Sequence, residues 1–331
     1  MIQDTSHENG RLLSGLSLKF RSCFMWKYFA EYFPIKLHRT VELAPSFVHN
    51  GVPPPQWSQL DSRTKIWKLM FWWYYLLQPT VADMKPTGIK YVFGYHPHGI
   101  IGMGVIGGIT SDGAGWSKLF PGIPVRALTL TNNFVVPFYR EYLKLLGVGS
   151  VAKRSCLALL ENNQPICLVL GGAQESLLAR PGTMDLILKK RLGFVKVAMQ
   201  AEGSTSLVPI IAFGENDVYN QVDNQSNSIL FKVQTSIKKI LGFTLPLMHA
   251  RGVFNYDVGI MPYRRPINIV VGRPVPVPHK AEPSSEELQH YQSLYIAELQ
   301  RVFDENKSKF FVDYSDDGDK DVSSFELRLV E

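Results

Sequence analysis

The sequence has little cysteine, little charge and no long apolar run. Its three cysteines, Cys23, Cys156 and Cys167, have spacings that match neither a disulfide framework nor a zinc site, so we expect a reducing compartment. No stretch of about 18 consecutive apolar residues is present, so no segment of the sequence is a certain transmembrane helix. The polar first residues, MIQDTSHENG, are not typical of a secretory signal peptide.

The composition is that of a chain that folds. Hydrophobic residues make up 45% and charged residues 19% of the 331 residues, which excludes disordered and collagen-like chains. This length suits one large or two ordinary domains. The net charge of +6 favours an anionic partner, and composition alone leaves nucleic acid, an anionic membrane surface and a phosphate-bearing ligand open.

The N-terminal part of the chain is basic and aromatic. Residues 11–39 contain six basic residues, seven aromatic residues and one acid, Glu31. This composition suits a helix in a membrane interface, and an amphipathic helix packed on the body of the protein explains it equally well. The proline-rich residues 41–64 are expected to form a connector.

A second aromatic segment follows at residues 66–77, where six of twelve residues are aromatic. The segment is too short to cross about 30 Å of hydrocarbon as a straight helix. It either dips into one leaflet, which the clustered Trp and Tyr residues favour, or forms a buried core helix.

From residue 90 onward, short apolar runs alternate with helical stretches. The runs predict buried strands at residues 91–95, 125–130, 166–170, 207–212 and 267–271. Helices are predicted at residues 138–146, 155–161, 195–201, 229–241 and 285–310, the last opened by a capping box of Ser284 and Glu287. This alternation predicts an α/β fold with a mostly parallel sheet flanked by helices on both faces.

A glycine pattern at residues 102–107 spells G-x-G-x-x-G but does not predict a dinucleotide site. In that fold the first glycine ends the strand and an acid follows about 20 residues later, and neither condition holds here. We expect these glycines to let a helix pack closely on the sheet or to leave room for an acyl chain.

The turn after the strand at residues 91–95 reads His96-Pro97-His98-Gly99. Open α/β sheets place their ligand crevice at the carboxyl ends of such strands. Because the proline restricts both its own φ and the conformation of His96, we expect the two imidazole rings to point in different directions. These four residues by themselves fit a structural role or half of a metal site as well as catalysis.

Six sequence blocks in order make a family recognisable. They are Tyr32-Phe33-Pro34, the histidine turn, residues 137–141 (PFYRE), residues 171–176 (GGAQES), residues 191–196 (RLGFVK), and Val208-Pro209 with residues 213–216 (FGEN). Together, over residues 26–310, they closely resemble the diacylglycerol O-acyltransferase 2 family, which includes monoacylglycerol and wax-ester acyltransferases.

The resemblance implies transfer of a fatty acyl group from acyl-CoA to the free hydroxyl of 1,2-diacylglycerol, which gives triacylglycerol. It implies a glycerolipid-acyltransferase-like fold with an N-terminal membrane-associating segment and connector (residues 1–89), a catalytic domain (90–312) and an acidic flexible tail (313–331). The expected place is the endoplasmic reticulum membrane and lipid droplets, with the catalytic domain facing the cytosol. Acyl-CoA is a substrate, so no separate cofactor is expected.

Several alternatives remain open at this point. The acceptor can instead be a monoacylglycerol or a fatty alcohol. An alternative from a different functional class is a non-catalytic protein that binds lipid at a membrane or lipid-droplet surface. Expected partners are acyl-CoA, diacylglycerol and a membrane or lipid-droplet surface, with a homo-oligomer left open. No nucleic-acid-binding module is recognisable in the sequence, so no nucleic acid is expected.

Histidine suits the chemistry that the resemblance implies, because a base has to take the proton of a weakly nucleophilic hydroxyl. Related glycerolipid acyltransferases carry an aspartate four residues beyond the histidine, and here no aspartate lies nearer than Asp112. Glu175 is our candidate carboxylate to orient the imidazole. Its rival role is an acid that complements the dipole at a helix start. We prefer His98 as the base and expect His96 to support the turn or the substrate.

Further residues carry binding hypotheses. The Gly99 N–H can donate to an oxyanion, and Gly171 and Gly172 permit a close approach. Arg140, Lys153 and Arg154 are placed to engage the phosphates of CoA, or are simply solvated residues at helix ends. Glu215 and Asn216 follow a strand and so reach the edge of the crevice.

Two other chemistries are disfavoured. Cys156 and Cys167 fall on apolar elements and are expected to be core residues rather than nucleophiles. No third ligand is spaced to complete a zinc site with the two histidines, so no metal is expected.

Overall fold

The computed structural model describes residues 13, 15–49, 84–221, 248–254, 259–314 and 321–330. The aromatic segment at residues 66–77 and the helix predicted at residues 229–241 lie outside the described residues.

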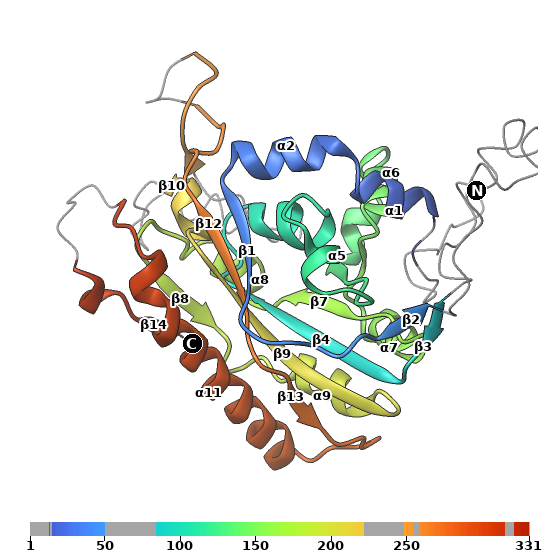
Figure 1. Ribbon diagram of the computed structural model, residues 1–331. Coiled ribbons are helices and arrows are strands. Elements are labelled where there is room, and N and C mark those ends of the chain that lie inside the picture. The colour runs from blue at the N-terminus through green and yellow to red at the C-terminus, as the bar shows by residue number, and fades with distance from the viewer. Residues whose placement is uncertain are drawn as a thin grey trace, which may run out of the picture.

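An eight-stranded sheet forms the centre of the described fold (Figure 1). Along the sheet the strands are β1 (Ile35–Arg39), β12 (Ile267–Val271), β9 (Ser204–Phe213), β4 (Ile89–His96), β7 (Ile166–Val169), β5 (Arg126–Thr129) and β6 (Gly149–Ser150), and β13 (Val275–Val277) also pairs with β9. Strands β9, β4, β7, β5 and β6 run parallel, as predicted for four of them. The fifth predicted strand, β12, is instead antiparallel to β9, so the sheet is mainly parallel with an antiparallel side.

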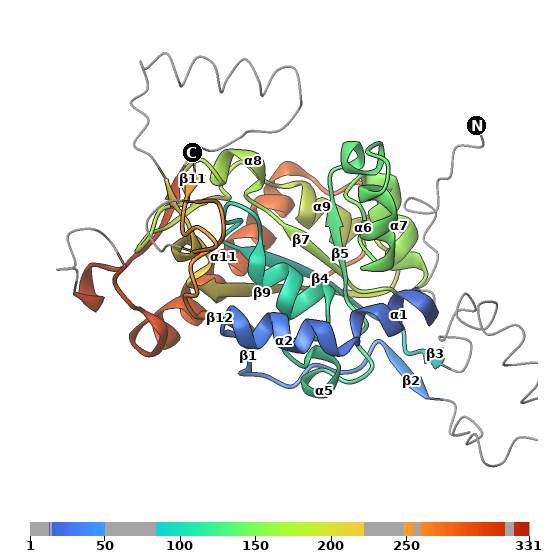
Figure 2. The ribbon, with the colours of Figure 1, turned by 90° about the horizontal axis from the view of Figure 1, so that it is seen from above.

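Helices cover both faces of this sheet. Figure 2 shows α2 and α5 on one side of β4 and β9, and α7 and α9 on the other. The first layer consists of α2 (Phe24–Tyr32), η3 (Val105–Thr110) and α5 (Trp116–Leu119), and the second of α7 (Lys153–Glu161), α9 (Gly193–Gln200) and α11 (Ser285–Phe310). Each layer encloses its own hydrophobic core, which confirms the predicted two-sided α/β architecture.

Short elements complete the described structure. They are α1 (Gly15–Arg21), α6 (Tyr139–Leu145), α8 (Gly172–Glu175), η4 (Thr131–Phe134), η5 (Glu215–Val218), η6 (Val322–Ser324), and the strand pairs β2 (Phe47–His49) with β3 (Met84–Pro86), β8 (Met184–Ile187) with β14 (Leu327–Val330), and β10 (Asn220–Gln221) with β11 (Met248–His249). The pairing of β14 with β8, and the burial of Phe325 in the core, correct the expectation of a flexible tail for residues 321–330.

Alternation along β4 sends consecutive side chains to different layers. Successive residues of a strand point to opposite faces of its sheet. Phe93 and Tyr95 join the core beneath η3, whereas Val92 joins the core beneath α11. By the same alternation, His96 lies on the α11 side, so Tyr95 and His96 meet different partners.

The glycine-rich segment lets a helix pack closely on the sheet, which is one of the two roles expected from the sequence. Residues 105–110 form a π-helix that lies against β1 and β12. A Cβ atom at Gly107 would lie 2.5 Å from Ile35 Cδ1, and one at Gly108 would lie 2.3 Å from Ile269 Cδ1. A side chain at either position would have to displace the end of the isoleucine that it meets.

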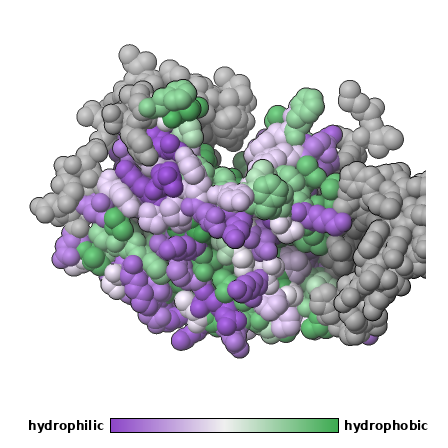
Figure 3. Space-filling view, turned by 45° about the horizontal axis from the view of Figure 1, so that its top comes forward, coloured by the Kyte–Doolittle hydropathy of each residue, from purple (hydrophilic) through white to green (hydrophobic). Residues whose placement is uncertain are grey.

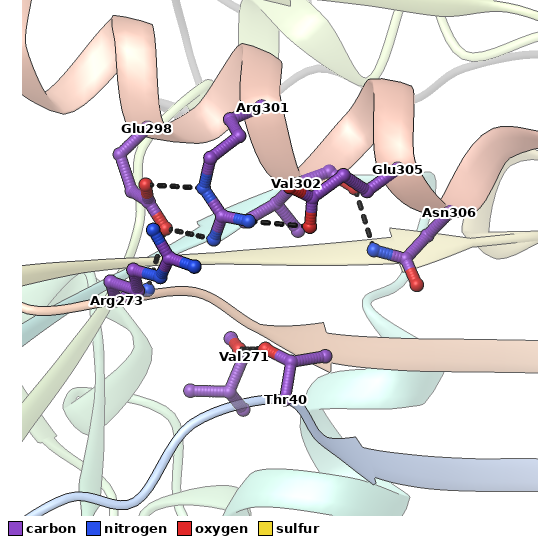
Figure 4. A network of polar contacts seen from close by, with 8 residues as sticks. All are labelled: Thr40, Val271, Arg273, Glu298, Arg301, Val302, Glu305 and Asn306. Atoms are coloured by element: carbon purple, nitrogen blue, oxygen red, sulfur yellow. Dashed lines mark hydrogen bonds and ion pairs between the residues drawn. The ribbon is translucent and has the colours of Figure 1, made fainter.

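Helix α11 is fixed to the sheet by an apolar stripe and by a hydrogen bond to the chain after β12, while ion pairs connect successive turns of the helix. This stripe is buried and consists of Leu288, Tyr295, Leu299, Val302 and Phe303. On the outer side, Arg301 bridges Glu298 and Glu305, and Glu298 also accepts a hydrogen bond of 2.7 Å from the backbone N–H of Arg273, just after β12 (Figure 4). The predicted capping box is confirmed, with Ser284 and Glu287 bonding each other's backbone N–H groups.

The N-terminal helix α2 is amphipathic. Trp26 and Ala30 are buried, whereas Phe24 and Tyr28 are exposed. The helix therefore packs on the body of the protein with one face and leaves aromatic side chains in solvent on the other. Among the described residues, no helix combines the length and apolar character needed to cross a bilayer.

We predict that Ser284→Ala lowers the free energy of unfolding by about 1 kcal/mol, because an N-terminal N–H of α11 loses its acceptor. Urea denaturation followed by circular dichroism measures this change. The control is Ser293→Ala, whose exposed hydroxyl bonds only within the helix, to the carbonyl of Gln289. Equal stabilities of the two variants would contradict the capping role.

Candidate active site

The histidine turn lies between the chain segments that leave two neighbouring strands. Strand β4 pairs in parallel with β7 on one side and with β9 on the other. The residues that follow these strands therefore meet at one edge of the sheet. Helix α8 brings Glu175 from the β7 side, and η5 brings Glu215 from the β9 side. Both side chains reach the turn.

His98 has the geometry of a general base. Its Nδ1 lies 2.8 Å from the carbonyl oxygen of Gly99. A carbonyl oxygen only accepts, so Nδ1 carries the proton and Nε2 keeps its lone pair. Burial lowers the pKa of His98 below 6.5, and the Gly99 carbonyl opposes this shift in part. The ring is therefore mainly neutral at pH 7 and able to accept a proton.

Glu175 holds the backbone of the turn rather than the imidazole ring. Its Oε1 accepts a hydrogen bond of 2.6 Å from the N–H of His98, and its Oε2 accepts one of 2.9 Å from the N–H of Ile187. The carboxylate lies over Gly171, where a Cβ atom would come within 2.1 Å of it. The far ring nitrogen, where we expected this carboxylate, is instead bonded to Gly99. The two residues are together as predicted, but their contact is a different one.

Glu215 forms the opposite wall of the turn. Its Oε2 accepts hydrogen bonds from the Tyr95 hydroxyl (2.6 Å) and from the N–H of Gly104 (2.9 Å). Its Oε1 is buried and has no partner among the described residues. A Cβ atom at Gly99, where φ is +63°, would lie 2.8 Å from Glu215 Cγ, so the side chain and the turn are in direct contact.

Burial leaves both carboxyl groups easy to protonate. The pKa of Glu175 rises to about 7, and the hydrogen bonds from His98 and Ile187 limit the rise. The pKa of Glu215 also rises to about 7, against the hydrogen bonds from Tyr95 and Gly104. The turn is thus clamped by two acids whose charge is disfavoured by their surroundings.

His96 is fully buried and has a different partner from His98, as the proline between them led us to expect. Its Nε2 lies 2.9 Å from the Tyr295 hydroxyl, which itself donates to the carbonyl oxygen of Gly94 at 3.2 Å. Because the hydroxyl donates its one proton to the Gly94 carbonyl, it can only accept from His96, and the His96 Nε2–H therefore donates to Tyr295. Burial lowers the pKa of His96 to about 3, which keeps the ring neutral.

Two residues of this site were missed at the sequence level. Tyr295 falls in the apolar stripe of the final helix, and Tyr95 falls inside a buried strand, so both read as core residues. No local pattern distinguishes a core tyrosine from one whose hydroxyl meets a histidine or a carboxylate. The period-2 alternation of the strand was the available signal for Tyr95, because it separates that residue from His96.

The three basic residues proposed for CoA lie farther along the same edge. Arg140, on α6 after β5, bonds Glu141 at 2.8 Å, and Lys153 and Arg154 are exposed at the start of α7 after β6. Strands β5 and β6 lie two and three places from β4, or about 10 to 15 Å by strand spacing. This separation suits an extended ligand rather than contact with the histidines.

The other predicted residues lie on either side of the turn. Gly172 has a φ of +64° and open space beside it. The side-chain N–H₂ of Asn216 donates to the carbonyl of Thr183 at 3.0 Å and makes no hydrogen bond to either histidine. Asn216 therefore anchors the neighbouring loop and is not brought to the histidines.

The cysteines and metal sites give simple results. Cys156 and Cys167 are buried, and burial raises the pKa of the Cys156 thiol to about 12 and that of the Cys167 thiol further. Both are core residues, as expected. Within the described ranges, no three His, Cys, Asp or Glu side chains are grouped to bind a metal ion.

Comparison with known proteins identifies the family. Residues 55–318 match the family model described as diacylglycerol acyltransferase. The chain is 46% identical over 316 residues to diacylglycerol O-acyltransferase 1 of Eremothecium gossypii, with 93% of this chain and 67% of that protein covered. It is 42% identical to diacylglycerol O-acyltransferase 1 of Saccharomyces cerevisiae (93% and 74% covered) and 37% identical to bovine 2-acylglycerol O-acyltransferase 1 (88% and 74% covered). No solved structure matches the chain significantly. The chain belongs to the diacylglycerol acyltransferase family.

We predict that Glu215→Gln flattens the pH dependence of stability. A carboxyl group whose pKa is about 7 when folded and 4.5 when unfolded binds its proton more tightly in the folded protein. Its contribution to the free energy of unfolding is full below pH 4.5 and is lost as the pH rises to about 7. The glutamine variant does not titrate at this position, so it should not lose this part of the free energy of unfolding as the pH rises. Urea denaturation at several pH values measures the free energy of unfolding of both proteins. Glu326→Gln, at an exposed position, is the control. Parallel curves for wild type and Glu215→Gln would refute the prediction.

Proposed function

We propose that this protein is a diacylglycerol O-acyltransferase, which moves a fatty acyl group from acyl-CoA to the free hydroxyl of 1,2-diacylglycerol. The observation that carries the proposal is the contact of 2.8 Å between His98 Nδ1 and the Gly99 carbonyl oxygen, which assigns the ring proton to Nδ1 and leaves Nε2 to accept a proton. The relatives named diacylglycerol O-acyltransferase, at 42–46% identity, support the same acceptor.

The proposed reaction is direct transfer in a complex of both substrates. The hydroxyl oxygen attacks the thioester carbonyl while His98 Nε2 takes the hydroxyl proton. The Gly99 carbonyl stabilises the imidazolium that forms, which is the role that a carboxylate has in a serine-hydrolase triad. Collapse of the tetrahedral intermediate breaks the carbon–sulfur bond, and the imidazolium proton passes to the departing CoA sulfur. The products are triacylglycerol and CoA.

The residues around His98 then act as positioning groups. Glu175 fixes the backbone at His98, Glu215 limits the space beside Gly99, and Tyr295 holds His96 at the end of the strand. The Gly99 N–H is our candidate donor to the oxyanion. Arg140, Lys153 and Arg154 are our candidates for the CoA phosphates, because an extended CoA molecule spans the separation between β4 and β6.

A second acceptor is supported by one comparison. The similarity to bovine 2-acylglycerol O-acyltransferase 1, at 37% identity, favours a monoacylglycerol acceptor as the alternative. Parallel assays with diacylglycerol, monoacylglycerol and a long-chain alcohol separate the acceptors. A non-catalytic lipid-binding protein is the alternative of another class, and it predicts no product with any acceptor.

The proposed place of action is the endoplasmic reticulum membrane and the lipid-droplet surface, with the catalytic domain on the cytosolic side. Aromatic and basic residues in the N-terminal region support a membrane partner. Residues 11–39 and 66–77 are our candidates for this contact.

We predict that His98→Ala lowers triacylglycerol synthesis from labelled oleoyl-CoA and diacylglycerol by roughly 10²- to 10⁴-fold, because the base is lost. Membrane association should be unchanged. His279→Ala is a matched control, since His279 also bonds a backbone carbonyl, that of Ala201, but away from the site. Wild-type kcat/KM should fall only as the pH drops below 6.5, since the pKa of His98 is lowered. Full activity of His98→Ala would refute the role of this base.

We predict that Tyr295→Phe lowers kcat about ten-fold with little change in KM. The substitution removes the acceptor of the buried His96 N–H, which should cost about 1–3 kcal/mol of stability and loosen the end of β4. Tyr291→Phe, on the same helix and half-buried, is the control. A folded Tyr295→Phe variant with normal kcat would show that Tyr295 has only a packing role.

A further inference from the structure

Exposed apolar side chains gather in a few segments of the described structure. All the exposed large apolar residues that the structure describes, except Val48, Leu294 and Val312, fall within residues 24–32, 101, 130–142, 151, 253–254 and 260. We call the surface formed by these segments the carboxyl-edge face.

Strand directions place these segments on the same side as the histidine turn. Ile101 follows β4, residues 130–142 follow β5, and Val151 follows β6, so all three lie at the carboxyl ends of parallel strands. Strand β12 is antiparallel to β9, and β1 is parallel to β12, so both of these strands begin at that same edge. Helix α2 leads into β1, and residues 253–254 and 260 precede β12.

The figures agree with this placement. In Figure 1, α2, α6 and the segment next to β10 lie along the upper side of the molecule, whereas α11 runs along the lower left. Figure 3, with that upper side brought forward, shows hydrophobic side chains on both sides of a notch in the surface. The carboxyl-edge face is therefore hollowed and has an apolar rim.

Phe138 is the most unusual residue of the rim. Its side chain is 90% exposed, and its backbone adopts a φ of +61°, which is rare for a bulky residue. Phe254, which lies between β11 and β12 in the chain, is fully exposed. An aromatic side chain that is held in solvent by a strained backbone suggests a function outside the folded core.

The charge on this face and on the segments beside it is positive. Among the described residues of 24–32, 99–104, 130–154 and 251–265 that are not buried, seven are basic and two are acidic, which gives a net charge of +5. Both acids, Glu31 and Glu141, form ion pairs, with Lys27 and Arg140. The face therefore combines exposed apolar groups with an excess of cations.

An aromatic depression on this face has a guanidinium at its edge. The depression, of about 610 Å³, is lined by Met25, Tyr28, Phe29, Glu31, Tyr32, Phe33 and Arg264. The Arg264 guanidinium lies 4.5 Å from the centre of the Tyr32 ring. Aromatic rings beside basic groups are the combination that the interface of an anionic bilayer favours.

We propose that the carboxyl-edge face docks on an anionic phospholipid surface, with the rim residues around Phe138 and Phe254 inserted among the lipids and the histidine turn opening toward them. The inference rests on the proposed function in one respect, since diacylglycerol dissolves in lipid and reaches such a turn without crossing water. A second copy of the chain fits less well, because two copies of this face, each with the same excess of cations on it and beside it, repel each other.

Environment-sensitive labels test the contact directly. In a Cys23→Ser background, where the remaining cysteines are buried, Val135→Cys and Phe254→Cys each receive an NBD fluorophore. Leu294→Cys on α11 is the matched control, with 42% exposure on another side of the molecule. With vesicles of phosphatidylcholine and phosphatidylserine, labels at 135 and 254 should shift to the blue, brighten and be quenched by brominated lipid. The label at 294 should not change.

Three outcomes would overturn the proposal. The labels at 135 and 254 can stay in water although the protein floats with the vesicles, which would place the contact elsewhere. All three labels can respond equally, which would mean that no face is selected. The shift can also occur without vesicles and grow with protein concentration, which would mean a protein partner. Triacylglycerol synthesis is measured in the same samples, so its absence together with a normal shift rejects only the proposed function.

A combined variant tests the consequence for activity. Val135→Ser, Phe138→Asn and Phe254→Ser together remove apolar side chains, and asparagine tolerates the positive φ at position 138. Activity on vesicles should fall at least about ten-fold, because less apolar surface enters the lipid. Activity on short-chain substrates in solution should be kept, as it should for the Leu294→Ser control on both substrates. Unchanged vesicle activity of the triple variant would contradict the docking.

Discussion

The parallel pairing of β4 with both β7 and β9 is the constraint on which the site depends. It brings the ends of three strands to one place, and the chain uses each end for a different purpose. The β4 end supplies the histidine turn, the β7 end supplies Glu175, and the β9 end supplies Glu215. The two carboxyl groups contact the turn from opposite sides and leave little freedom for its backbone. The rigidity of the turn is thus a product of the sheet order.

The alternation of side chains along β4 ties this turn to both helix layers. Tyr95 points to the η3 side and donates to Glu215, while His96 points to the α11 side and donates to Tyr295. Neighbouring residues therefore connect the turn to two different cores. This arrangement explains why a tyrosine about 200 residues away in the sequence holds the histidine next to the proposed base. It also explains why the two histidines have different environments despite being two residues apart.

Burial at the edge of the sheet has one consistent electrostatic effect. It lowers the pKa of His98 and raises the pKa values of Glu175 and Glu215 to about 7. Burial therefore favours the neutral form of all three groups over the charged form. Such surroundings suit a reaction between a hydroxyl and a thioester that both belong to long apolar molecules. The proposed docking of the carboxyl-edge face would extend this effect, because a docked face would keep water away from the turn. The cations on and beside the face would contact anionic headgroups.

The sequence by itself determined where five strands of the central sheet lie, the capping box of α11, the place of the histidine turn and the family. Hydrophobic periodicity, turn residues and motif order are local properties, so they can be read along the chain. It also indicated that Glu175 and Glu215 would lie near the histidines, since residues after parallel strands share an edge. It did not reveal that β12 is antiparallel or that residues 321–330 add a strand to β8, because pairing partners are far apart in the sequence.

Only the tertiary structure decided which atoms meet at the site. Glu175 bonds the His98 backbone instead of its ring, because the carboxylate lies over Gly171 and the Gly99 carbonyl already holds the ring nitrogen. Tyr295 and Tyr95 became site residues only when long-range packing aimed their hydroxyl groups. A contact of this kind is made or lost when the distance between two distant segments changes by a few tenths of an ångström. Such distances are set by packing rather than by residue type.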